Sequence, residues 1–154
     1  MSGSHNTIIR KAELEDAAVI SRLISSLSHL YLQDSSAQLP EWFAKTLCIA
    51  ELERRLKDSH FEHYVFLTGS EITGYIAIKD GHHLYHLFVA EHQQRKGIAK
   101  QLWKHASTTS DTYTVRSSIN AIPFYKHLGF KESAAQANKS GIAYQCMTFV
   151  REMT

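Results

Sequence analysis

The chain has 154 residues, the length of one ordinary globular domain. Its 17 Lys and Arg residues stand against 15 Asp and Glu residues, a net charge of +2, and 44% of its residues are hydrophobic. This composition excludes a disordered chain, and the even charge balance argues against a dedicated nucleic-acid-binding or polybasic membrane protein. We expect residues 1–6 to form a flexible lead-in and residues 7–154 a single domain.

The first half of the chain predicts a strand at 7–11 and then two helices. The apolar residues of the first helix recur at helical spacing, at Ile20, Leu23, Ile24, Leu27 and Tyr31. After a polar loop at 33–38, Pro40 is well placed to open the second helix. The apolar stripe of this second helix is expected at Trp42, Ile49, Leu52 and Leu56.

The pattern then changes to short runs that are typical of strands. Three runs, at 63–67, 72–79 and 82–89, are separated by turns, of which Asp80-Gly81 is a strong hairpin signal. They predict an antiparallel meander.

Helices and strands alternate in the remainder of the chain. We expect a helix at 97–107, a strand at 113–116, a helix at 123–128 that Gly129 ends, and a last hairpin from 131 to 150. The resulting order, β-α-α-β-β-β-α-β-α-β-β, predicts a mixed α/β (α+β) domain with a largely antiparallel sheet.

Two further features favour a cytoplasmic protein without membrane association. No apolar run approaches the roughly 20 residues of a membrane span, and we expect no secretory signal. Cys48 and Cys146 lie far apart and form no CxxC pair, so we expect reduced thiols, mostly in the core.

The segment 94–99, Gln-Arg-Lys-Gly-Ile-Ala, carries the first functional signal. It connects a predicted strand to the start of a helix, where backbone amides lack partners and the helix dipole is positive. Gly97 and Ala99 leave the backbone uncrowded, while Arg95 and Lys96 add positive charge. The segment therefore predicts a pyrophosphate site. Taken alone, the pattern also fits a helix that begins at a glycine after a solvated basic turn.

A second motif follows after the next predicted strand and consists of Asn120, Phe124-Tyr125 and Leu128-Gly129-Phe130. With Gln94, Gly97 and Ala99 of the first motif, it resembles the GNAT superfamily of acyl-CoA-dependent N-acyltransferases. The resemblance extends over about 7–150, because the element order also matches. Two departures are Ala99, where many members have glycine, and Glu91-His92, where a proline is common.

The resemblance implies the GNAT fold, a mixed, mostly antiparallel central sheet of about seven strands flanked by about four helices and splayed between strands four and five. It also implies acetyl-CoA as co-substrate, with its pyrophosphate on the loop amides. Leu87 and Val89 are candidate backbone partners of the pantetheine arm. The residues expected along the cofactor are Leu87, Phe88, Val89, Gln94, Arg95, Lys96, Gly97, Ile98, Ala99, Asn120, Phe124, Tyr125 and Lys126.

The implied chemistry is direct attack of a primary amine on the thioester. The tetrahedral oxyanion needs a donor, for which the amide of Leu87 or Phe88 is the candidate. Tyr125 matches the family's usual acid by position, and an ordinary tyrosine pKa near ~10 suits donation to a thiolate whose conjugate acid has a pKa of ~8.5. A tyrosine that only packs at the start of a helix is the alternative.

The proton acceptor is expected on the strand 82–89. Alternation puts His83, Tyr85 and Leu87 on one face, and His82, Leu84, His86 and Phe88 on the other, barring a bulge. Some GNAT arylalkylamine acetyltransferases carry two histidines on this strand, at positions that match His83 and Tyr85. His83 therefore ranks first and His86 second, and a packed or surface histidine is the alternative for either.

A metal site is not expected on this strand. His82 and His86 would lie ~13 Å apart along it, which is too far to share one ion.

The acceptor amine is expected between the first two helices and the strands. Tyr31, Trp42, Tyr85 and the loop 33–38 are candidate walls, with core packing as the favoured alternative for Trp42. Nothing marks an acidic pocket for a polyamine. The sequence leaves open whether the amine belongs to a small molecule or to a peptide or protein, and whether the acyl group is longer than acetyl.

Two other functions are weighed against the enzyme. The first is a catalytically degenerate GNAT-fold sensor of acyl-CoA, against which Asn120 and Tyr125 argue. The second is nucleic-acid binding through Arg95, Lys96, Lys100 and Lys104, charges that the phosphates of CoA explain better. We therefore expect no nucleic-acid partner. Because many relatives are dimers, a homodimer is among the expected assemblies.

Overall fold

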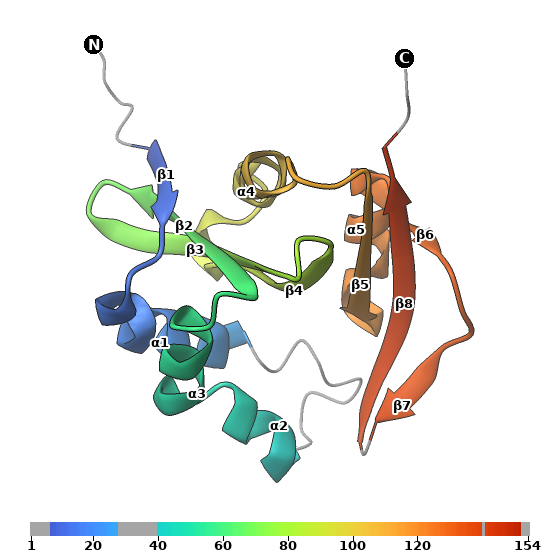
Figure 1. Cartoon of the computed structure of the whole chain (residues 1–154), viewed down its shortest axis with the longest axis horizontal. Helices are drawn as coiled ribbons and strands as arrows, with labels where there is room; N and C mark the ends of the chain where they lie inside the picture. Colours follow the sequence, from blue (N-terminus) through green and yellow to red (C-terminus); the bar gives the residue numbers. More distant parts are fainter. Residues whose placement is uncertain (1–6, 28–39, 140, 152–154) are drawn as a thin grey trace.

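The computed structural model describes residues 7–27, 40–139 and 141–151 (Figure 1). The first half contains β1 (Thr7–Lys11), α1 (Ala17–Leu27), α2 (Glu41–Thr46), α3 (Ile49–Leu56), β2 (Phe61–Thr68), β3 (Glu71–Lys79) and β4 (His83–Val89). The second half contains α4 (Ile98–Ala106), β5 (Thr112–Ser118), α5 (Ile122–Leu128), β6 (Lys131–Glu132), β7 (Ala137–Lys139) and β8 (Ile142–Val150). The predicted mixed α/β fold is confirmed.

The strands form one eight-stranded sheet in the order β1-β2-β3-β4-β5-β8-β6, with β7 also paired to β8. The predicted meander of β2, β3 and β4 is confirmed as antiparallel. The sheet has more strands than expected because two short segments, β6 and β7, both pair with the long strand β8.

The only parallel pair in the described sheet is β4 with β5, and it is short. It holds just two register pairs, His83 with Thr114 and Leu84 with Val115. Beyond them β4 continues along β3 to Val89, and β5 continues along β8. The two strands therefore diverge, with β1–β4 on one side of Figure 1 and β5 and β8 on the other.

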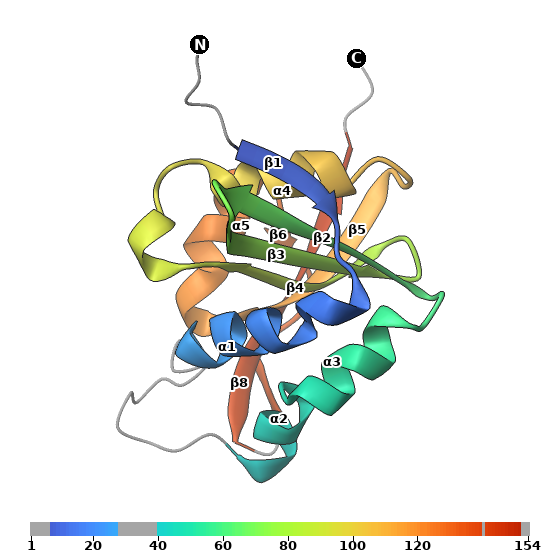
Figure 2. The same cartoon turned by 90° about the vertical axis from the view of Figure 1, so that its left-hand side faces the viewer.

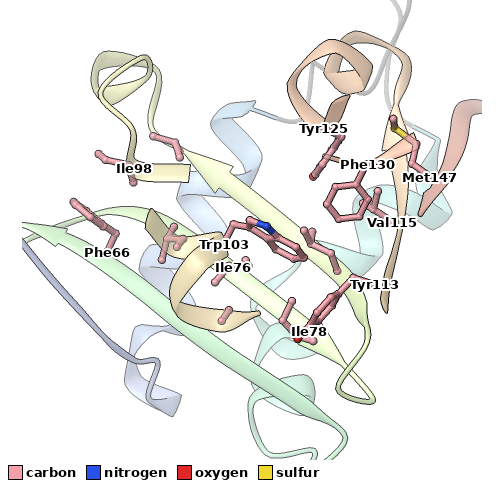
Figure 3. Close-up of a cluster of buried hydrophobic side chains, with 14 residues drawn as sticks. Phe66, Ile76, Ile78, Ile98, Trp103, Tyr113, Val115, Tyr125, Phe130 and Met147 are labelled. Carbon is pink, nitrogen blue, oxygen red and sulfur yellow. The ribbon is translucent and has the colours of Figure 1, made fainter. Parts of the chain in front are cut away.

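Helices cover both faces of the β1–β4 half. On one face, Trp103 of α4 lies in one buried cluster with Phe66, Ile76 and Ile78 (Figure 3), and Leu102 of the same helix belongs to that cluster. On the other face, α1 and α3 lie beside each other (Figure 2) and bury a second core. Burial of these side chains is the main favourable contribution to folding.

Gly74 on β3 determines how closely α4 approaches the sheet. A Cβ atom at this position would lie 2.9 Å from Leu102 Cδ1 and 3.0 Å from Ile98 Cγ2. Both distances are shorter than ordinary carbon contacts of about 3.5–4.0 Å. The glycine therefore lets the first turns of α4 sit directly on β3.

The predicted second helix is in fact two helices. Between them, Leu47 turns into the core with 2% of its surface exposed, and its carbonyl accepts a 2.9 Å hydrogen bond from Ser21 Oγ. Cys48 is extended at the start of α3. The expected continuous stripe is therefore wrong, and Ile49 is 45% exposed.

The cysteine prediction is also wrong in part. Both cysteines are free, but Cys48 is exposed at this break between the helices and Cys146 is only partly buried. The expected extension of the first helix to Tyr31, and the loop 33–38, lie outside the described residues. None of the helices in the described ranges is long and apolar enough to cross a membrane.

Candidate active site

A β-bulge at Tyr85 interrupts the alternation of β4. His86 pairs with Ala77 and Leu84 with Ile78, so Tyr85 has no partner in the register with β3. Leu84 consequently faces the core under α4, whereas Tyr85 packs on the core under α1.

The bulge makes the expected face assignment wrong. Leu87 packs with the core under α4 and not with Tyr85. The ring of His86 lies against Tyr75, Tyr85 and Phe88, on the face of α1 and α3. Tyr85 and His86 are therefore on the same face, although they are adjacent in sequence.

A cavity of about 560 Å³, here called cavity 1, opens where β4 and β5 diverge. Its walls are β4, the start of α4, the end of β5 and α5. The expected cofactor residues that line it are Leu87, Phe88, Val89, Gln94, Arg95, Gly97, Ile98, Ala99, Asn120, Phe124 and Tyr125. Lys96 and Lys126 do not line it, and Lys126 Nζ pairs with Glu132 Oε1 at 2.7 Å.

The turn before α4 presents free backbone amides to cavity 1. Arg95 and Gly97 have left-handed φ angles of +67° and +81°. The first intrahelical bond runs from the amide of Gln101 to the carbonyl of Gly97 (3.0 Å), so the amides of residues 98–100 have no acceptor within the helix. Gln94 Nε2 donates to the Val89 carbonyl at 3.0 Å and thereby ties the turn to the end of β4.

The charge of cavity 1 suits an anion. Arg95, Lys100 and Arg116 line it, and none of its described lining residues is acidic. Sequence reasoning missed Arg116, Ser118 and His127 here. It attributed the charge of Lys100 to the phosphates of CoA but did not name Lys100 among the expected cofactor residues. Lys100 lies in the first turn of α4, so helical spacing from Gly97 could have identified it. Arg116 and Ser118 are two residues apart on β5 and could have been identified by alternation.

Tyr125 lies on α5, a helix with a proline in its first turn and Gly129 at its end. Its ring packs against that of Phe130 (Figure 3), with the ring centres 5.5 Å apart, and only 7% of the residue is exposed. The hydroxyl makes no hydrogen bond with another described residue, and the side chain lines cavity 1. Burial raises the pKa of Tyr125, so the hydroxyl stays protonated at neutral pH.

A second cavity of about 560 Å³, cavity 2, lies on the other side of the divergence. Its lining comes from α2, the β3–β4 turn, β4, β5 and the β7–β8 hairpin. Trp42 and Tyr85, two of the expected acceptor residues, are in this lining, and Tyr31 lies outside the described residues. The two cavities meet at five shared residues: Leu84, Tyr85, His86, Arg116 and Ser118.

The two candidate histidines of β4 have different surroundings. His83 lines cavity 2 alone, and its Nδ1 lies 2.7 Å from Thr114 Oγ1. His86 lines both cavities and is 6% exposed, and neither ring nitrogen has a partner among the described residues.

Both imidazoles have lowered pKa values. Burial, with the charge of Arg116 next, lowers the pKa of His83. Burial, followed by the charge of Arg55, lowers the pKa of His86 well below the ordinary value. Both histidines are therefore neutral at pH 7.

The buried side chain of Arg55, which the sequence did not predict, packs against the ring of Tyr85. Arg55 is 1% exposed, donates from Nη2 to the Thr46 carbonyl (2.7 Å), and places Cζ 5.3 Å from the centre of the Tyr85 ring. The Arg55 carbonyl lies 3.0 Å from His63 Nε2, which must donate, so His63 Nδ1 accepts from the Tyr75 hydroxyl at 2.7 Å. These contacts fix the rings next to His86.

Comparison with known proteins is consistent with this geometry. Residues 31–151 match the family model described as an acetyltransferase (GNAT) domain. No curated protein matches the sequence.

Similar solved structures include three acetyltransferases. A GCN5-related N-acetyltransferase from Rhodopseudomonas palustris is 20% identical with a TM-score of 0.73, and the match covers 97% of this chain and 99% of that one. PaiA N-acetyltransferase from Thermoplasma acidophilum, solved with coenzyme A, is 15% identical with a TM-score of 0.76 (94% and 98% covered). A variant of spermidine N-acetyltransferase SpeG from Vibrio cholerae is 16% identical with a TM-score of 0.67 (95% and 94% covered).

Proposed function

We propose that this chain, which belongs to the GNAT acetyltransferase family, transfers an acetyl group from acetyl-CoA to a primary amine in a ternary complex. The observation that carries this proposal is the meeting of two cavities at the bulge of β4, with His86 in the lining of both. Two substrates bound from opposite sides would meet there, next to an unpartnered neutral imidazole and close to Tyr125 in cavity 1.

The residues of cavity 1 fit acetyl-CoA. Its pyrophosphate suits the free amides of residues 98–100 and the charges of Arg95 and Lys100. Its extended, amide-containing arm suits the edge of β4, which no described strand covers after Leu84. When bound, acetyl-CoA supplies an acyl group activated as a thioester. The CoA complex of the T. acidophilum protein supports the same assignment.

We propose His86 as the residue that takes the proton of the attacking amine. An amine attacks only when neutral, so an acceptor is required at the junction of the cavities. His86 is neutral at pH 7 and lies at that junction, and both of its ring nitrogens are buried with no partner among the described residues. We propose that a rotation of the ring or a bridging water brings one of these nitrogens within reach of the amine. His83, which ranked first from the sequence, lies in cavity 2 alone and is engaged with Thr114.

We propose Tyr125 as the donor to the departing thiolate. Its hydroxyl is protonated at neutral pH and has no competing acceptor among the described residues. Burial strengthens its hydrogen bond to a developing negative charge, because few other dipoles screen that charge.

The test is amine-dependent release of CoA thiol, measured with acetyl-CoA and a panel of primary amines. We expect turnover by the wild-type protein and a loss on the order of 100-fold in kcat for Tyr125→Phe, with acetyl-CoA affinity retained. Tyr64→Phe is the matched control, because Tyr64 lines neither cavity, and it should keep full activity. Tight acetyl-CoA binding without turnover on any amine would instead support the sensor alternative.

A further inference from the structure

The charge of cavity 2 indicates what the acceptor carries besides its amine. Its described lining contains three permanent cations, Lys79, Arg116 and Lys139, against one carboxylate, Asp80. None of the three cations forms an ion pair with a carboxylate in the described ranges of the chain. The cavity is therefore an electropositive compartment whose charges are available to a ligand.

Aromatic rings hold these cations in place without neutralising them. Lys139 Nζ lies 4.9 Å from the centre of the Trp42 ring, and Arg116 Cζ lies 5.3 Å from that of Tyr144. Both rings also line cavity 2. A guanidinium that lies on the face of an aromatic ring keeps its N–H donors available around the edge of the guanidinium. Two of these donors match the two oxygens of a carboxylate or phosphate.

Arg116 stands where the cavities meet, and acetyl-CoA does not account for it. The charged part of acetyl-CoA is its phosphates, which the proposed assignment puts at the turn before α4. The thioester end, which would lie near Arg116, is uncharged. A cation at the reacting end is therefore better matched to an anion on the other substrate, close to its amine.

We propose, on the basis of the proposed function, that the acceptor is an amine that also bears a carboxylate or phosphate, held by Arg116 with Lys79 and Lys139. Its apolar part packs against Trp42 and the other aromatic walls of cavity 2. A polyamine is disfavoured, because its added positive charges would face the three cations. This chain shares its fold with a spermidine acetyltransferase, but a shared fold does not establish a shared substrate.

The test uses ligand pairs that differ only by the anion and whose binding does not depend on catalysis. Calorimetry would compare N-acetylphenylalanine with N-acetylphenethylamine on the CoA-loaded protein. We expect the anionic member to bind at least about 10-fold more tightly, and Arg116→Gln to remove most of that preference. Lys57→Gln, a change at an exposed lysine that lines neither cavity, should preserve it.

Turnover of phenylalanine, phenethylamine, O-phosphoethanolamine and spermidine then identifies the anion and separates the two proposals. An anion preference in binding without turnover of any amine would contradict the enzyme but uphold cavity 2 as a site for a ligand that bears a carboxylate or phosphate. Equal or weaker binding of the anionic member, a preference unchanged in Arg116→Gln, or turnover of spermidine above all others would overturn the inference and leave the enzyme standing.

Discussion

The two cavities share strand β4 but are built in different ways. Cavity 1 is formed mainly by two continuous segments, 93–100 and 115–128, placed against β4, and the anion site that we propose in it consists of backbone amides. Cavity 2 is lined by residues from four separate parts of the chain, namely α2, the β3–β4 turn with β4, β5, and the β7–β8 hairpin, and its cations are side chains. If the proposed assignment holds, binding of acetyl-CoA depends on backbone conformation that local sequence fixes, whereas binding of the acceptor depends on side chains that can change without altering the fold.

The largest effect is expected at the junction of the two cavities. If His86 accepts the proton of the amine, His86→Gln should lower kcat by at least about 100-fold, since general-base groups contribute about 10²–10⁴-fold. The glutamine has a similar size but cannot take a proton at neutral pH. The measurement is steady-state CoA release, with His83→Gln alongside. A larger loss in His83→Gln than in His86→Gln would return the role to His83.

A smaller effect, confined to cavity 1, is expected for Gly97→Asp. The new carboxylate would compete with phosphate for the free amides, and any side chain is strained at φ +81°. We expect acetyl-CoA to bind on the order of 30-fold more weakly by calorimetry. Gly69→Asp is the matched control, because Gly69 has a similar φ of +63° and a Cβ atom added there would meet nothing within 4 Å. If both variants bind acetyl-CoA equally, the turn is not the anion site.

A further prediction concerns the close packing of α4, which lines cavity 1, on Gly74 of β3. Gly74→Ala would force apart Leu102 and β3, so the free energy of unfolding should fall by about 1–3 kcal/mol in urea titrations. Because α4 would shift, acetyl-CoA affinity should fall as well. Adding Leu102→Val removes the nearest clashing atom, so the pair should be less destabilising than the sum of the single changes. Simple additivity would contradict this packing account.

The smallest predicted effect is a pH dependence of stability. Burial lowers the folded-state pKa of His86, whereas an unfolded histidine has a pKa near 6.5. Below pH 6.5 the unfolded state therefore binds more protons, and the free energy of unfolding falls as the pH falls.

Between pH 6.5 and 5.5, His86 should account for about 1 kcal/mol of that loss. Urea unfolding of His86→Gln should show a correspondingly shallower decline than the wild type. Exposed His105 offers the control, and His105→Gln should follow the wild type. An unchanged slope in His86→Gln would mean that this ring is not buried in its neutral form.

The sequence was informative where local residues determine local structure. Gly97 at the start of α4 and Gly129 at the end of α5 both have positive φ, and each lies in a recognisable motif. The bulge at Tyr85 has no such signature, because it depends on the register between β3 and β4. The faces of His83 and His86 relative to Leu84 and Leu87 could not be predicted without it.

Tertiary packing explains the other failures. The break between α2 and α3 follows from the burial of Leu47 and its bond with Ser21, partners from different helices. Arg116 and Lys139 reach the same cavity from β5 and the end of β7. The sequence suggested the absence of an acidic pocket, but only the assembled sheet brings the cations together.

The measurement that tests the account most directly is hydrogen–deuterium exchange of the wild-type protein with and without acetyl-CoA. We predict slower exchange in segments 94–101 and 118–128, where the ligand would take up free amides and cover α5. Segments 41–46 and 137–144, which contribute to cavity 2, should change little until an acceptor is added. Protection confined to those acceptor segments, or no protection in 94–101 at saturating acetyl-CoA, would contradict the assignment of the two cavities.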